Sequence, residues 1–275
     1  MKKILIASAL AVVVTNLALA QATKNVEVTI DSVAGFQDTP LQPDGKWHVH
    51  DPARPQPPVV TPGSSFSQQA APPSDAIVLF DGKDLSHWHD KKTGSDAQWK
   101  IEDGVMVSAK GDIETTNKFG DIQLHIEFKE PVPAKGEGQG RGNSGVYFMG
   151  LYEIQILDCY EAKSYADGST GAIYGQHPAL ANACRPPGEW QTYDIIFTAP
   201  RFGADGTVIS PAYVTVTLNG IVVQNHQAYR GASNWKSPGK YSAHAAELPL
   251  ALQYHNNSVS FRNIWVRPVP FVNDP

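Results

Sequence analysis

Three polar side chains stand in an apolar, strand-forming run between residues 143 and 158: Glu153, Gln155 and Asp158. Alternate residues of a strand point to the same face, so Glu153 and Gln155 must share a face, whereas Asp158 falls on the opposite one. A single β-bulge after Gln155 would return Asp158 to their side, and bulges are common next to active sites. Two carboxyls and one amide in a row on a sheet face suit acid–base chemistry on a sugar.

The same residues have a second interpretation, because antiparallel sheets commonly keep one face in water. Glu153 and Asp158 would then be solvated polar residues with no chemical role. His255, at the end of a predicted strand, also has two interpretations. It would either transfer protons, since the ordinary pKa of histidine lies near neutrality, or be a surface or hydrogen-bonded structural histidine.

Short strands separated by turns are predicted from residue 75 to about residue 270. Apolar residues alternate most clearly over 121–129 and 190–198. Asp103-Gly104 and Asn219-Gly220 each separate two strand-like runs, which is typical of hairpins. Further strands are predicted over 77–80, 99–102, 105–108, 213–218, 221–225, 248–254 and 259–266. Since no stretch of a dozen residues has a helical period, the pattern predicts an all-β sandwich or jelly roll.

The first 20 residues predict a secretory signal peptide. Lys2 and Lys3 precede an apolar run over residues 4–14, and the small residues at 18–20 suit cleavage after Ala20. The run is too short for a membrane span, and no later segment is apolar over the required length. We therefore expect an exported protein, periplasmic or secreted, without a transmembrane segment.

Residues 21–74 predict a proline-rich arm followed by a linker. Proline fixes φ and cannot donate to a strand ladder, so this stretch cannot form a regular central strand or helix. Trp47, Val49 and Phe66 offer apolar points of attachment, and the first part is expected to lie over the domain. Residues 63–73, rich in Ser and Gln, are expected to be the linker proper.

Charge and cysteine content narrow the partners and the compartment. The net charge of −5 argues against nucleic acid or an anionic membrane surface as a partner. The two cysteines, Cys159 and Cys184, form an even count that suits an oxidising compartment. We expect a disulfide between them rather than two free thiols, and it would remove roughly 3–4 kcal/mol of loop entropy from the unfolded chain.

Several motifs occur in order across residues 76–268. They are Leu79-Phe80-Asp81-Gly82 with Ser86-His87-Trp88, Gly142-Asn143-Ser144-Gly145, Tyr152 to Asp158, Gly171-Ala172-Ile173-Tyr174-Gly175, Arg185-Pro186-Pro187-Gly188-Glu189-Trp190, and Phe261-Arg262-Asn263-Ile264-Trp265. In this order and spacing they resemble the 3-keto-disaccharide hydrolase domain family. The resemblance implies a concanavalin-like jelly roll of two antiparallel sheets, with a small carbohydrate substrate on the concave face.

The Glu-x-Gln-x-x-Asp pattern also resembles the bulged catalytic strand of laminarinase-type glucanases, with Gln155 in place of the central acid. That replacement argues against ordinary double displacement. A 3-keto sugar offers another route, because its ketone acidifies the C2 hydrogen and allows the C1 substituent to leave by elimination. Water would then add to the enone. Direct hydrolysis at C1 stays open as the alternative.

This chemistry needs a base near C2, an acid for the leaving oxygen, and donors to the enolate oxygen. The predicted catalytic residues are Glu153, Asp158 and His255, with the choice of base between the two carboxyls left open. The predicted substrate-binding residues are Gln155, Arg141, Asn143, Tyr174 and Trp190. Trp190 or Trp88 would stack on a sugar ring, although Trp190 also suits a core position.

No cofactor is predicted. The sequences His48-Val49-His50-Asp51 and His87-Trp88-His89-Asp90 place alternate histidines as strand metal ligands are placed. Two-residue spacing alone fixes neither ligand number nor geometry, so a divalent metal has no support from the sequence.

Two other classes of function stay open. A lectin-like module of the cell envelope would bind glycans on the same sheet face without cleaving them. A structural envelope protein would use the N-terminal arm to contact a partner and would neither bind nor cleave sugars.

Overall fold

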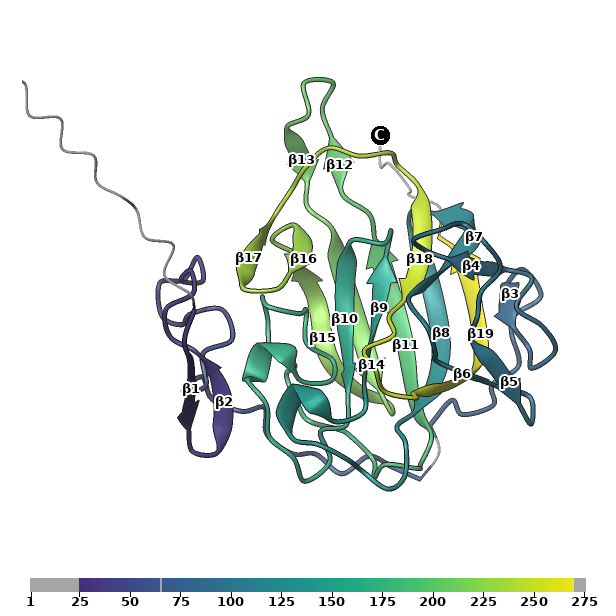
Figure 1. Ribbon diagram of the computed structural model, residues 1–275. Helices are drawn as coiled ribbons and strands as arrows, with labels where there is room; N and C mark the ends of the chain where they lie inside the picture. Colours follow the sequence, from purple (N-terminus) through teal and green to yellow (C-terminus); the bar gives the residue numbers. More distant parts are fainter. Residues whose placement is uncertain (1–24, 65, 270–275) are drawn as a thin grey trace, which may run out of the picture.

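The protein is described by a computed structural model that covers residues 25–64 and 66–269; the expected signal peptide lies outside the described residues. The described chain consists of β-strands and two short 3-10 turns, η1 (Gly138–Gly140) and η2 (Ala166–Gly168). Two large antiparallel sheets pack face to face, as seen in Figure 1. The predicted all-β sandwich is therefore confirmed.

The smaller of the two large sheets has five strands in the order β10-β9-β18-β7-β4. Their bounds are β4 (Trp88–Asp90), β7 (Ile113–Phe119), β9 (Asn143–Phe148), β10 (Tyr152–Leu157) and β18 (Leu248–Leu252). Strand β10 therefore lies at one edge, and residues 171–172 cover that edge: the Gln155 amide donates to the Ala172 carbonyl and the Gly171 amide donates to the Gln155 carbonyl, both at 3.0 Å.

The larger sheet has eight strands in the order β15-β14-β11-β8-β19-β6-β5, with β3 paired to β19. Their bounds are β3 (Ile77–Phe80), β5 (Lys100–Glu102), β6 (Val105–Val107), β8 (Ile122–Lys129), β11 (Gln191–Thr198), β14 (Tyr213–Leu218), β15 (Ile221–Ala228) and β19 (Ser260–Pro268). Three two-stranded ribbons complete the fold: β1 (Glu27–Ile30) with β2 (Val33–Phe36), β12 (Arg201–Phe202) with β13 (Val208–Ser210), and β16 (Ala232–Asn234) with β17 (Ser237–Lys240).

The core lies between the two large sheets and follows from strand alternation. Leu124, Ile126 and Phe128 of β8 are fully buried, and Phe148 of β9 stacks on Phe197 of β11 with ring centroids 4.5 Å apart. Each such fully buried side chain contributes about 1.5–3 kcal/mol of transfer free energy. Because the even-numbered residues of β9 and β10 point into this core, their odd-numbered residues face away from it.

The N-terminal arm packs on the domain along much of its length. Val49 and His50 are fully buried, and the His50 ring lies 4.1 Å from that of Tyr165, centroid to centroid. The segment expected as the linker proper also contacts the larger sheet. There the Ser67 hydroxyl donates to Asp194 at 2.6 Å, and the Gln69 amide donates to Glu127 at 2.5 Å.

Cys159 and Cys184 form the expected disulfide. This bond ties the end of β10 to the loop before β11 across 25 residues. A disulfide fits an extracellular or periplasmic protein. In the described part of the chain, no helix has the length and apolar character needed to cross a bilayer.

Candidate functional site

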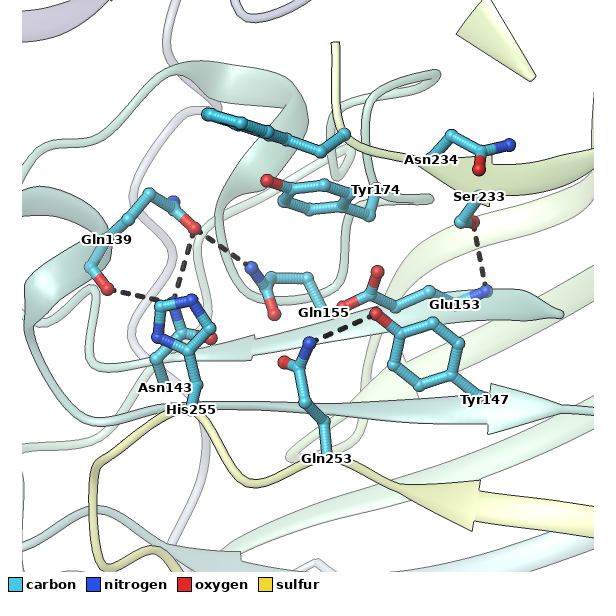
Figure 2. Close-up of a pocket in the computed structure, with 11 residues that line it drawn as sticks. Gln139, Asn143, Tyr147, Glu153, Gln155, Tyr174, Ser233, Asn234, Gln253 and His255 are labelled. Carbon is cyan, nitrogen blue, oxygen red and sulfur yellow. Dashed lines mark hydrogen bonds between the residues drawn. The ribbon is translucent and has the colours of Figure 1, made fainter. Parts of the chain in front are cut away.

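A cavity of about 170 Å³ lies on the face of the five-stranded sheet that points away from the core. Figure 2 shows its polar lining, to which strands β9 and β10 contribute the floor. Residues that line it are Gln139, Asn143, Tyr147, Glu153, Gln155, Tyr174, Ser233, Asn234, Trp235, Gln253 and His255. Amide, phenol and carboxyl groups thus converge on one small space.

The register of β9 against β10 explains the floor. Glu153 pairs with Tyr147, and Gln155 pairs with Gly145, without any shift between Tyr152 and Leu157. Paired residues in an antiparallel ladder share a face, so these side chains point into the cavity together. Strand alternation, which predicted that Glu153 and Gln155 share a face, is confirmed.

Gly145 leaves the space that the Glu153 side chain occupies. A Cβ on Gly145 would stand 2.5 Å from Glu153 Oε1 and 2.9 Å from a ring carbon of Tyr147. Both separations are shorter than van der Waals contact. The absence of a side chain at position 145 therefore lets the carboxyl lie over the neighbouring strand.

Glu153 is 2% exposed and is the one carboxyl that lines the cavity among the described residues. Burial raises its pKa to about 8, a hydrogen bond with the Tyr147 hydroxyl lowers it, nearby Asp112 raises it and Lys91 lowers it. A carboxyl with a pKa near 8 holds its proton at pH 7 in most molecules and is ionised in about one molecule in ten. Such a group is suited to proton transfer near neutral pH.

An amide network spans the end of the cavity near η1, with Gln139 at its centre (Figure 2). The Oε1 atom of Gln139 accepts hydrogen bonds from Gln155 Nε2 at 3.2 Å and Asn143 Nδ2 at 3.3 Å. Its Nε2 atom donates to Ser164 Oγ at 2.7 Å and the Gly168 carbonyl at 2.8 Å. These bonds fix the amides in orientation, and Asn143 Oδ1 has no hydrogen-bond partner among the described residues.

Tyr174 comes from the loop that covers the edge of β10. Its hydroxyl lies 3.0 Å from that of Tyr165, and its ring lies 4.9 Å from the ring of His50. His50 belongs to the N-terminal arm and its Nδ1 lies 3.2 Å from Asp167 Oδ1, with both side chains fully buried. Burial raises the pKa of Tyr174, so this phenol remains a hydrogen-bond donor across the neutral range.

The wall beyond the edge of β10 comes from β16 and the turn after it. The Ser233 hydroxyl accepts a hydrogen bond from the Glu153 backbone amide at 3.1 Å (Figure 2). Trp235 lines the cavity while its side chain remains 66% exposed, and Lys236 Nζ lies 4.2 Å from its ring centroid. An exposed indole beside a polar cavity is a surface on which a sugar ring can stack.

Asp158 does not line this cavity. The continuous β9–β10 register leaves no room for the expected bulge, and Asp158 follows the last residue of β10 without returning to the face of Glu153. Its Oδ2 atom instead accepts from Arg141 Nε at 3.0 Å and Nη2 at 2.6 Å. The expected bulge is therefore wrong, and the Asp158–Arg141 ion pair accounts for both side chains.

His255 lies at the cavity beyond β18, where its side chain is exposed (Figure 2). Trp190 lies elsewhere, between Lys129 Nζ at 4.8 Å and the Arg262 guanidinium at 4.0 Å from its ring centroid. Trp88 is buried in the core and its indole donates to the Leu79 carbonyl at 2.8 Å. Of His255, Trp190 and Trp88, His255 is therefore the one that lines the cavity.

His50 and His89, one from each His-x-His-Asp motif, each lie beside a carboxyl. His50 pairs with Asp167, whereas His89 Nε2 lies 3.1 Å from Glu114 Oε1. No group of three or more His, Cys, Asp or Glu side chains in the described ranges has the arrangement of a metal site.

Six cavity residues were not predicted: Gln139, Tyr147, Ser233, Asn234, Trp235 and Gln253. Tyr147 could have been found, because a tight turn centred on Gly150 places it opposite Glu153. Gln253 lies two residues beyond Ala251, which pairs with Tyr147, and strand alternation gives it the same face. The residues of β16 and η1 come from loops with no local pattern that relates them to β10.

Comparison with known proteins identifies the family. The 3-keto-alpha-glucoside-1,2-lyase-like domain matches residues 75–267. A crystal structure of a candidate glycosyl hydrolase from Parabacteroides distasonis ATCC 8503 is 48% identical, with a TM-score of 0.71, over 78% of this chain and 93% of its own. Another candidate glycosyl hydrolase from that organism is 23% identical over 71% of this chain and 94% of its own, and its TM-score of 0.52 shows a shared fold. No curated protein matches the chain.

The matched segment occupies well over half of the 275 residues and contains both large sheets and all eleven residues of the cavity lining. The expected resemblance is confirmed. The chain belongs to the 3-keto-alpha-glucoside-1,2-lyase-like domain family, and with it to the carbohydrate-active β-sandwich proteins.

Proposed function

We propose that this protein cleaves 3-keto-glycosides, such as 3-keto-disaccharides, with Glu153 as the base that removes the C2 proton. The observation that supports it most is the position of Glu153, a buried carboxyl with a pKa of about 8 on the floor of a polar cavity. The family description, which names a lyase acting on a 3-keto-alpha-glucoside, supplies the substrate class.

The count of carboxyls favours elimination over conventional glycoside hydrolysis. Retaining and inverting glycosidases generally use two carboxyl groups that flank the scissile bond. Within the described residues, Glu153 lines the cavity without a second carboxyl, and Asp158 is held by Arg141 outside it. One base is sufficient when a ketone at C3 acidifies the C2 hydrogen.

In this route Glu153 takes the proton from C2, and the electron pair of that C–H bond passes to the ketone oxygen as an enolate. The enolate then collapses to form the C1–C2 double bond while the C1–O bond breaks. The departing oxygen takes a proton and leaves as an alcohol, which balances the elimination. Addition of water across the enone, with hydroxide to C1 and a proton to C2, gives the free 3-keto sugar.

Neutral donors are available for the enolate oxygen and the sugar hydroxyls. Burial raises the pKa of the Tyr147 and Tyr174 hydroxyls, so both phenols retain their protons at neutral pH. Gln155 and Asn143 are held by Gln139, and the Gln253 amide donates to the Tyr147 hydroxyl at 3.2 Å. Donors that are fixed before substrate arrives need little reorganisation as charge develops.

His255 and Trp235 complete the proposed site. His255 is exposed at the cavity and is assigned to proton transfer to the leaving oxygen. Trp235 is assigned to stacking on a sugar ring. Arg141 and Trp190, which lie outside the cavity, have no part in the proposal.

The test is turnover of 3-keto-trehalose and 3-keto-sucrose by the wild type, Glu153→Gln and Asp158→Asn, with released sugar measured by chromatography. Glu102→Gln, at an exposed residue of β5, is the matched control. Glu153→Gln is expected to abolish turnover. Asp158→Asn is expected to retain turnover per mole of folded protein, with the folded fraction measured by thermal melts. Sugar binding without turnover by the wild type would instead indicate a lectin-like module.

A further inference from the structure

A second, larger cavity adjoins the first. Its volume is about 640 Å³, and Gln139 lines both cavities. Residues that line it are Glu27, Ser32, Ala34, Glu137, Gly138, Gln139, Gly140, Arg141, Glu161, Ala162, Lys163, Ser164 and Tyr165. The partition between the two cavities thus includes the Gln139 side chain, together with the Tyr165–Tyr174 pair whose members line one cavity each.

The first cavity is small for a disaccharide. Its volume of about 170 Å³ falls below the roughly 300–1,000 Å³ that is usual for sites of drug-sized ligands. One sugar ring is a suitable occupant, and the second ring of a disaccharide must then lie outside it. The adjoining cavity is within the usual range of volumes and begins at the same amide.

The lining of the second cavity favours a neutral, polyhydroxylated ligand. Its charged residues are of both signs, with Glu27, Glu137 and Glu161 against Arg141 and Lys163. Arg141 is paired with Asp158, which leaves three glutamates against Lys163. An anionic ligand would meet this excess of like charge, whereas sugar hydroxyls can donate to the carboxylates and accept from Lys163.

The N-terminal arm builds one wall of this cavity. Ser32 and Ala34 belong to the hairpin formed by β1 and β2, which stands beside the sandwich in Figure 1. The hairpin is attached where the Phe36 amide donates to the His50 carbonyl at 2.9 Å. His50 is in turn held by Asp167, so the wall is fixed to the same group of residues that supports Tyr174.

We propose that the second cavity is the binding site for the leaving-group sugar of the substrate, and that the N-terminal hairpin selects glycosides with a sugar rather than a small alkyl leaving group. This inference rests on the proposed function for the identity of the first ring. The arm thereby has a role in substrate selection. It lies outside the matched family domain, which begins at residue 75.

Ala34→Trp tests the inference, because an indole at an exposed position of the wall fills the cavity without entering the core. Val26→Trp is the control, since Val26 is 64% exposed beside the same hairpin and does not line the cavity. Ala34→Trp is expected to raise the KM for a 3-keto-disaccharide about tenfold or more and to leave methyl 3-keto-glucoside nearly unchanged. An equal effect on both substrates, or none on either, would overturn the inference.

Calorimetric binding to Glu153→Gln gives a second readout that does not depend on turnover. The disaccharide is expected to bind about tenfold or more tightly than the methyl glycoside, and Ala34→Trp in the same background removes that difference. Equal affinities for the two sugars, or no binding of either, would contradict a second sugar site. If the proposed function is wrong, the result is different: Glu153→Gln then keeps the turnover of the wild type.

Discussion

The carboxyl of Glu153 lies over Gly145 of the neighbouring strand, so close that a Cβ on Gly145 would stand 2.5 Å from Glu153 Oε1. The carboxyl that we assign as the base can therefore lie there only because Gly145 has no side chain. Gly145 pairs with Gln155 in the β9–β10 ladder and needs no unusual backbone conformation there.

Gly145→Ala should displace the Glu153 carboxyl and the Tyr147 ring while the backbone of β9 stays in place. We expect kcat to fall about tenfold or more, because misplacement of a catalytic group by about 1 Å has a large effect on rate. Overpacking of this kind typically costs 1–3 kcal/mol, so a folded protein is expected at about 25 °C. Steady-state kinetics with urea unfolding checks this; unchanged kcat in the folded variant would contradict the role of Gly145.

The pH dependence of kcat/KM should follow the ionisation of Glu153. A base must be deprotonated, and the pKa of Glu153 is raised to about 8 by burial. We therefore expect kcat/KM to rise with pH by up to tenfold per unit, to reach half its maximum near pH 8 and to level off above that pH. A rate that falls as the pH rises through this value would show that Glu153 acts as an acid instead.

The free energy of unfolding should depend on the same ionisation of Glu153, and it should fall with rising pH whereas kcat/KM rises. The pKa of Glu153 is about 8 in the fold against an ordinary 4.5, so the folded state keeps a proton that the unfolded chain loses across that interval. The free energy of unfolding should then fall as the pH rises through this window, by at most about 1.4 kcal/mol per pH unit for this group.

Glu153→Gln cannot ionise and should lose less stability than the wild type between pH 5 and 8. Desolvation also raises the pKa of the buried Glu130 carboxyl to about 8, so Glu130→Gln should likewise lose less stability than the wild type over this pH range. Urea unfolding across this range measures both, with Glu102→Gln as the surface control. Parallel stability curves for wild type and Glu153→Gln would contradict a raised pKa.

Trp235→Ala should weaken sugar binding without weakening the fold. The side chain is 66% exposed, so its removal should change the free energy of unfolding by about 0.5 kcal/mol or less. Loss of an aromatic platform is expected to raise KM by about fivefold to tenfold. Trp190→Ala is the matched control, since Trp190 packs against Lys129 and Arg262 away from the cavity, and its KM should stay unchanged.

Much of this site follows from strand periodicity alone. Alternation places Glu153 and Gln155 on one face, and the tight turn at Gly150 then sets Tyr147 opposite Glu153. The sandwich itself follows from many short alternating runs that must bury one face each. Local pattern is sufficient for these features because the residues concerned are neighbours in one hairpin.

The remaining features depend on contacts between distant segments. Asp158 was assigned to the catalytic row only through a bulge, but its pairing with Arg141 is a tertiary contact that no local pattern reveals. Trp235 and Gln139 reach the cavity from loops on either side of β10. Gln69 lies in the segment expected as a linker, and its backbone amide donates to Glu127. Every residue except proline has such an amide, so composition does not predict this contact.

Isotope incorporation in D₂O tests most directly whether Glu153 is the base for C2. Wild-type protein should convert a 3-keto-disaccharide into 3-keto-glucose that contains deuterium at C2, above the level in a protein-free incubation, and Glu153→Gln should form none. Product that retains its original C2 hydrogen would show direct hydrolysis at C1. Deuterated product from Glu153→Gln at the wild-type rate would show that another group is the base.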